Sequence, residues 1–137
     1  MKFRIRDTSG WTMFIFGLMA LLLGVVALIY PESLLNILGF QVLPRAARTS
    51  GDHTLVFLTA SAMSSFNIGA YYMLAALNDM KKFYIWTVPF RAVTVTVFTI
   101  TVVTGLAPVR FLGVAAWELV GAIATGWALN AERKQVR

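Results

Sequence analysis

Four long stretches that are almost free of charge constrain the fold of this chain more than any other feature of its sequence. They cover residues 11–30, 54–77, 83–106 and 111–130. Arg91 and Glu118 are the two charged residues within them. About 20 apolar residues allow a helix to cross a hydrocarbon core of about 30 Å. Backbone groups in lipid must be hydrogen-bonded inside the segment, and these runs lack the alternation of a membrane β-barrel. We therefore predict an all-α integral membrane protein with four membrane-spanning helices.

The composition agrees with this class of protein. Apolar residues make up 58% of the chain and charged residues 13%, against roughly 45–50% and 25% in a soluble domain, so the chain needs a solvent other than water. Its 137 residues fit a single transmembrane domain over positions 1–137. The absence of cysteine excludes disulfides, thiolate metal sites and thiol catalysis. We expect residues 11–30 to be a retained helix and not a signal peptide, because the run is long and no clear small-x-small cleavage site precedes Pro31.

The connections between the stretches predict how the helices are arranged. Residues 78–82 and 107–110 form very short links, so the second, third and fourth helices should each lie antiparallel beside its sequence neighbour. The first link is longer, and "PESLLNILGF" predicts a short helix over residues 31–39, with Pro31 in its first turn and Gly39 at its end. We expect a four-helix bundle with a short interfacial helix between helices one and two.

Small residues repeat along one face of each of the first two spans. The repeats are Gly17, Ala20, Gly24 and Ala27 on the first span and Ser61, Ser65 and Gly69 on the second. Such faces let helix backbones approach closely in lipid. We expect them to pack inside the bundle, as an alternative to a dimerisation site.

The distribution of lysine and arginine predicts the orientation in the membrane. Eight of these residues would lie on one side, namely Lys2, Arg4, Arg6, Lys81, Lys82, Arg133, Lys134 and Arg137. Three would lie on the other side, namely Arg45, Arg48 and Arg110. The side richer in Lys and Arg faces the cytoplasm, so we predict a multi-pass protein of the cell inner membrane with both termini cytoplasmic. The aromatic residues Trp11, Tyr84, Trp86 and Trp127 would then lie near the cytoplasmic boundary, where such rings prefer to sit.

Arg91, within "TVPFRAVTVTVF", needs the most explanation. A central charge costs about 2.5–3.5 kcal/mol on insertion, and it normally faces the bundle interior or a water-filled cavity. Thr87, Thr94 and Thr101 lie close to the same helix face, and threonines can return their hydroxyls to their own backbone. Pro89 lacks a backbone donor and frees a carbonyl one turn earlier.

Asn67 and Glu118 are the polar residues nearest to Arg91 in depth. Helix rise places Arg91 about 12 Å and Asn67 about 15 Å from the cytoplasmic face, and Glu118 about 8–10 Å beyond Arg91. Three interpretations remain open. Arg91 snorkels to the cytoplasmic interface, or it pairs with Glu118 and hydrogen-bonds Asn67 as a structural clasp, or the three line a polar pocket for an anionic or polar ligand group.

No pattern in the sequence indicates catalysis or metal binding. His53, the single histidine, follows Asp52 at the outer end of the second helix, where the pair could support acid–base chemistry, but a loop histidine without a task is the simpler interpretation. One histidine without clustered ligands is not a metal site, and catalytic triads and glycine-rich phosphate loops are absent. We therefore expect no catalytic residue, no metal and no cofactor. A membrane isomerase that used Glu118 would lack a second titrating group.

Three stretches of the chain carry a resemblance to a known family. They are "LLLGVVALIYPESLLNILGF", "NIGAYYMLAALNDMKKFYIWTVPFRAV" and "ELVGAIATGWAL". In order and spacing they resemble the BphX-like family of small bacterial inner-membrane proteins over most of the chain, and DoxX-like proteins are similar in layout. The resemblance implies a bacterial four-helix membrane protein. This family is associated with aromatic-degradation gene clusters and has no settled biochemical role, so no catalytic residue is carried over.

Two functions follow from these observations. The first is a non-enzymatic membrane protein that acts as an accessory or partner-binding component of a membrane assembly. The second is binding or permeation of a small hydrophobic or aromatic molecule in a polar-lined pocket, which requires Arg91, Asn67 and Glu118 to converge on an accessible cavity. The lipid bilayer is a partner in both cases. Nucleic acid is not expected, because the basic residues lie mostly at segment ends, where topology signals and contacts with anionic lipid are found.

Overall fold

The computed structural model describes residues 5–135, and its secondary structure is entirely helical over that range. The elements are α1 (Thr8–Ile29), α2 (Glu32–Leu38), η1 (Arg45–Ala47), α3 (Thr54–Leu77), α4 (Lys81–Val103), η2 (Val109–Phe111) and α5 (Leu112–Gln135). The all-α prediction is therefore confirmed for these residues. The predicted topology residues Lys2, Arg4 and Arg137 lie outside the described part of the chain.

The helix ends follow from local sequence chemistry. Asp7 precedes α1, and its Oδ1 accepts a hydrogen bond of 2.8 Å from the backbone N–H of Gly10, one of the donors that a helix start leaves free. Pro31 stands at the start of α2, where a fixed φ suits the first turn. Gly39 ends α2 in the left-handed region at φ 82°, which a residue without Cβ adopts readily, as the sequence predicted.

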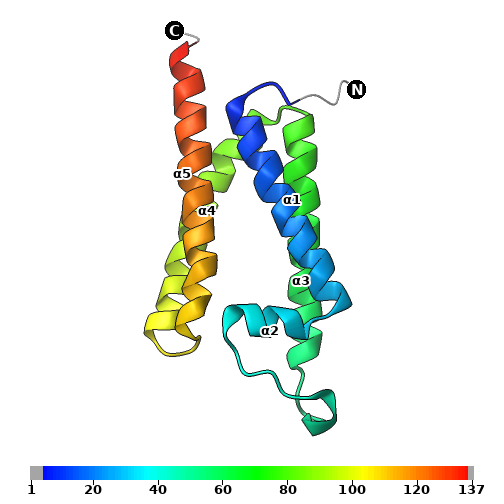
Figure 1. Ribbon diagram of the computed structural model, residues 1–137. Helices are drawn as coiled ribbons and strands as arrows, with labels where there is room; N and C mark the ends of the chain where they lie inside the picture. The colour runs from blue at the N-terminus through cyan, green and yellow to red at the C-terminus, as the bar shows by residue number, and fades with distance from the viewer. Residues whose placement is uncertain (1–4, 136–137) are drawn as a thin grey trace.

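The long helices form two packed pairs, α1 with α3 and α4 with α5, and α1 also packs against α5 (Figure 1). α3 and α4 are joined by a short turn but do not form a packed pair. The prediction that every short link would place sequence neighbours side by side is therefore wrong at this link. The physical reason is the seam between α1 and α3, whose small residues let the backbones touch, whereas α4 carries bulky side chains around most of its circumference.

Glycines set the distance between α1 and α3. A Cβ added to Gly69 would lie 2.5 Å from the backbone nitrogen of Leu21, and one added to Gly24 would lie 2.7 Å from that of Phe66. The hydroxyl of Ser65 donates to the carbonyl of Ala20 across the seam at 2.9 Å. The small faces thus pack inside the molecule as expected. Ser61 is the exception, because it is exposed and lies outside the seam.

Three segments are long and apolar enough to cross a membrane, namely Thr8–Ile29, Lys81–Val103 and Val109–Gln135. α3 has 24 residues, but its serines and Asn67 lower its hydropathy, and it is not among the three. Both described ends of the chain and the α3–α4 turn lie at one end of the molecule (Figure 1). α2 and the α4–α5 turn lie at the other end.

Candidate functional site

Arg91 lies between the two helix pairs, and its side chain is only 3% exposed. Its Nη1 is 3.4 Å from Oε2 of Glu118, an ion pair that joins α4 to α5. Its guanidinium carbon lies 4.6 Å from the ring centre of Phe16 on α1 and 5.1 Å from that of Tyr72 on α3. Arg91 therefore contacts all three other long helices, and its head group does not extend to the membrane end as a snorkelling arginine would.

The bonding of Arg91 is incomplete. Nε and Nη1 are buried and have no hydrogen-bond partner among the described residues, although guanidinium offers five N–H donors. The two aromatic faces supply cation–π attraction in their place. Gly121 provides the space, because a Cβ there would lie 1.9 Å from Nη1. The carboxylate of Glu118 is 24% exposed, so the pair is buried mainly on the arginine side.

Asn67, the third predicted site residue, is not part of this arrangement. It lies two residues before Gly69, about 200° around α3 from the face that packs against α1. Within residues 5–135 no hydrogen bond joins its side chain to Arg91 or Glu118. The structure therefore brings together two of the three residues and turns the third to a partly exposed face of α3.

The threonines of α4 return their hydroxyls to the helix backbone, as the sequence predicted. Thr87 donates to the carbonyl of Tyr84 at 2.7 Å, and Thr94 and Thr101 donate to the carbonyls four residues earlier at 3.1 and 2.8 Å. Their polarity is satisfied inside α4 and does not add partners to Arg91.

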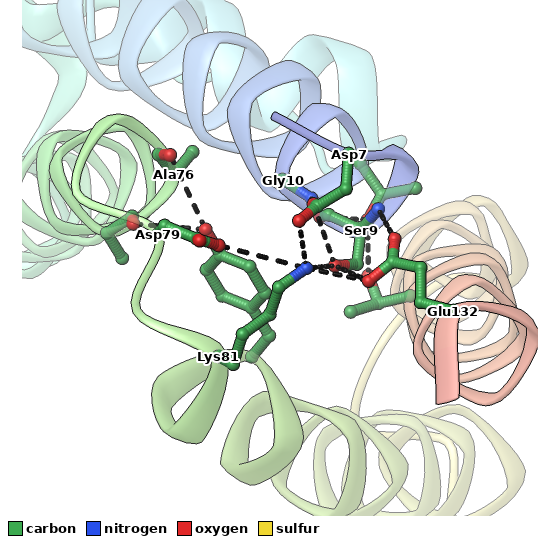
Figure 2. A network of polar contacts seen from close by, with 11 residues as sticks. Asp7, Ser9, Gly10, Ala76, Asp79, Lys81 and Glu132 are labelled. Carbon is green, nitrogen blue, oxygen red and sulfur yellow. Dashed lines mark hydrogen bonds and ion pairs between the residues drawn. The ribbon is translucent and has the colours of Figure 1, made fainter. Parts of the chain in front are cut away.

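A second polar cluster, which we call the Lys81 cluster, joins α1, α4 and α5 at the end that carries the termini (Figure 2). Lys81 Nζ contacts the carboxylate of Asp7, the hydroxyl of Ser9 at 2.7 Å and Oε2 of Glu132 at 2.6 Å. Oε1 of Glu132 accepts the backbone N–H of Ser9 at 2.7 Å and so caps the start of α1 from α5. The three ammonium N–H groups therefore meet three oxygen acceptors.

Burial alone would raise the pKa of Asp7. The hydrogen bonds from Lys81 and the Gly10 N–H outweigh it and lower the pKa below its usual value. Sequence reasoning missed this cluster because Asp7, Ser9 and Glu132 lie outside the apolar stretches on which the search for polar groups was based. The signal available was the Asp-x-Ser start of α1, together with Lys81 and Glu132 at matching depths.

Tyr84 packs inside the protein, unlike the other three rings that were predicted near the membrane boundary. The sequence placed it among the rings at the membrane boundary, but its side chain is fully buried below Lys81, and its hydroxyl donates to the carbonyl of Ala75 at 3.1 Å. Trp11, Trp86 and Trp127, by contrast, are exposed. Tyr84 is buried because it packs in one core cluster with Met13 of α1 and with Ala75 and Ala76 of α3, which helix periodicity alone does not reveal.

Two carboxylates at the α2 end are engaged in ion pairs. Asp52 accepts from the hydroxyl and backbone N–H of Thr54 and pairs with Arg48 at 2.7 Å, so its contacts are with these residues and not with a catalytic His53. Glu32 is 4% exposed and contacts Arg45 at 2.6 and 3.2 Å. The hydrogen bond from Arg45 lowers the pKa of Glu32 to about 2.

Two surface cavities are described, and neither is lined by Arg91, Asn67 or Glu118. One, of about 450 Å³, lies beside α2 and extends from Tyr30 to Val42. The other, of about 820 Å³, lies between the start of α4 and the end of α5. The requirement of the small-molecule hypothesis, a cavity on which those three residues converge, is not met by either.

The chain was compared with protein-family models, with curated proteins and with solved structures, and no match was found in any of the three.

Proposed function

We propose that this chain is a non-enzymatic integral membrane protein that binds another membrane protein through the outer face of α3. The observation that carries the proposal is Asn67. Its amide lies on the side of α3 opposite the α1 seam, about 15 Å from the helix end at Leu77, and has no hydrogen-bond partner among the described residues. If α3 spans the membrane as the fourth helix, this amide lies near the bilayer centre.

The energetics of lipid favour a protein partner at this position. An amide in hydrocarbon without a hydrogen bond costs roughly 2–7 kcal/mol, and Asn residues bond across helices for about 1–2 kcal/mol. Ser64 and Tyr71 share the Asn67 face at spacings of three and four residues, and both are exposed. A second transmembrane helix fits this face better than acyl chains do, because it can approach closely at Ser64 and can hydrogen-bond with the polar groups of Asn67 and Tyr71.

The same proposal includes a location. We place the protein in a bacterial inner membrane with both termini in the cytoplasm, because among the described residues the end with the termini carries five basic side chains (Arg6, Lys81, Lys82, Arg133 and Lys134) against three at the other end. The resemblance to BphX-like proteins belongs to this proposal and supports the bacterial inner membrane as the location.

Photo-crosslinking in native membranes tests the partner. A crosslinker placed at Tyr71 should give one discrete adduct with another membrane protein, and Asn67→Ala should abolish it. A crosslinker at Phe90, which is 65% exposed on α4, provides the control and should give lipid adducts alone. Lipid adducts alone at Tyr71 would contradict the proposal, and an adduct of twice the chain mass would replace the accessory role with self-association.

A further inference from the structure

The second cavity is a groove between the first two turns of α4 and the last turns of α5. Ile85, Val88 and Pro89 line it on α4, and Leu129 and Asn130 line it on α5. Its volume is about 820 Å³, and the groove is open to the outside of the molecule. These lining residues are mostly apolar, so acyl chain fits the groove better than water does.

Charged residues stand only at the end of this groove that lies near the chain termini. They are Lys81, Glu132 and Arg133. Lys81 is held by Glu132, at 2.6 Å, and by Asp7, so its positive charge is fully compensated within the Lys81 cluster. Arg133 is exposed and has no ion-pair partner in the described part of the chain, so it supplies the uncompensated charge of the rim.

Pro89 adds a polar feature inside the apolar part. It has no N–H, so the carbonyl of Ile85 cannot receive the helical hydrogen bond from residue 89. Both residues line the groove. Ile85 follows Lys81 by four residues, which places it about 6 Å further along α4, away from the end that carries the termini. At that depth the glycerol and ester region of a lipid meets the acyl chains.

We propose that this groove binds one anionic phospholipid of the leaflet that faces the termini, with an acyl chain along Val88, Pro89 and Leu129 and its phosphate on Arg133. Charge complementarity selects this occupant. A hydrophobic helix would leave Arg133 unpaired, whereas an anionic head group at the membrane surface meets an unpaired guanidinium that can bind phosphate in a bidentate manner. The site is separate from the Asn67 face and does not depend on the protein partner proposed for it.

Native mass spectrometry of the full chain, released from nanodiscs that contain equal amounts of phosphatidylglycerol and phosphatidylcholine, tests this site. The wild type should retain one phosphatidylglycerol in preference to phosphatidylcholine. Arg133→Gln should lower that preference about fivefold, the effect of about one basic residue at the membrane surface. Lys134→Gln is the matched control, because Lys134 is exposed, adjacent in sequence and absent from the groove lining.

A second variant tests the groove itself. Ile85→Trp should fill its mouth and reduce retention of both lipids, while the unfolding temperature shows whether the fold is kept, since Ile85 is 57% exposed. Equal losses from Arg133→Gln and Lys134→Gln would overturn the proposal in favour of diffuse surface charge. Equal retention of the two lipids by the wild type would also overturn it.

Discussion

Lys81 and Arg91 both bring a cation of α4 to a carboxylate of α5, but their surroundings are opposite in kind. Lys81 is 35% exposed, and its ammonium has an oxygen acceptor for each N–H. Arg91 is 3% exposed, its ion pair spans 3.4 Å, and two of its nitrogens have no hydrogen-bond partner in the described structure. Both also contact α1, through Ser9 in one case and Phe16 in the other.

The difference between the fully bonded Lys81 and the underbonded Arg91 shows where polar groups stabilise the fold. A satisfied cluster at a membrane end avoids most of the desolvation cost and joins three helices. A buried and underbonded pair is weak evidence of net stability, because desolvation can cancel its attraction. We infer that the Lys81 cluster holds the two helix pairs together, while Arg91 specifies how α4 is rotated between them.

The largest expected effect is at Lys81. Lys81→Met leaves the carboxylates of Asp7 and Glu132 without their shared cation, and we expect a loss of about 2–3 kcal/mol in the free energy of unfolding. This lies below the roughly 3–5 kcal/mol of a fully buried pair, because Lys81 is partly exposed to solvent. Lys82→Met, at an exposed neighbour, should change stability by less than about 0.5 kcal/mol in the same denaturation assay. Equal effects of the two variants would show that Lys81 contributes no more to stability than an exposed lysine does.

Gly121 tests the fit of the guanidinium. Gly121→Ala places a Cβ where Nη1 of Arg91 lies and should cost about 1–2 kcal/mol, because the buried side chain must shift against Phe16. Gly126→Ala is the matched control on α5, since its Cβ would meet Val88 at an ordinary 3.7 Å. Combining Gly121→Ala with Arg91→Ala should remove most of the cost. A persistent cost in that combination would show that Arg91 does not occupy the space beside Gly121.

A double-mutant cycle compares the two ion pairs directly. Arg91→Ala should destabilise the protein more than the double change with Glu118→Ala does, with a coupling of about 1 kcal/mol. The Lys81–Glu132 cycle should give the larger coupling, because that contact is 2.6 Å and has more shared partners. Additive losses at Arg91 and Glu118 would mean that the two charges do not interact.

The smallest effect is expected at the α2 end, where an exposed arginine meets a buried carboxylate. The hydrogen bond from Arg45 lowers the pKa of Glu32 from 4.5 to about 2, so the pair stabilises the fold fully above pH 4.5 and loses this contribution as the pH falls toward 2. The difference in Tm between the wild type and Arg45→Gln should therefore shrink over that interval. Arg110→Gln, at the same end and outside the ion pairs of the described residues, should give a difference that does not vary with pH in this way.

Much of the fold could be predicted from the sequence because lipid constrains it locally. The long uncharged run of residues 54–77 predicted a helix, and α3 has these bounds. Gly39 ends the short helix that follows Pro31, because a residue without Cβ readily adopts the left-handed conformation. Depth along a helix follows from a fixed rise per residue, but it left Glu118 about 8–10 Å beyond Arg91, and only the packed helices bring Nη1 to 3.4 Å from Oε2.

The tertiary structure alone decided which helices pack together and how each is rotated. Asn67 and Tyr72 differ by five residues on one helix, yet the first faces outward and the second contacts Arg91. That rotation depends on side chains from other helices, above all on the glycine seam between α1 and α3, and no pattern within a single span encodes it. For the same reason the Lys81 cluster, assembled from three helices, could be recognised only once they were placed together, whereas the bounds of the long helices follow from the apolar runs of the chain itself.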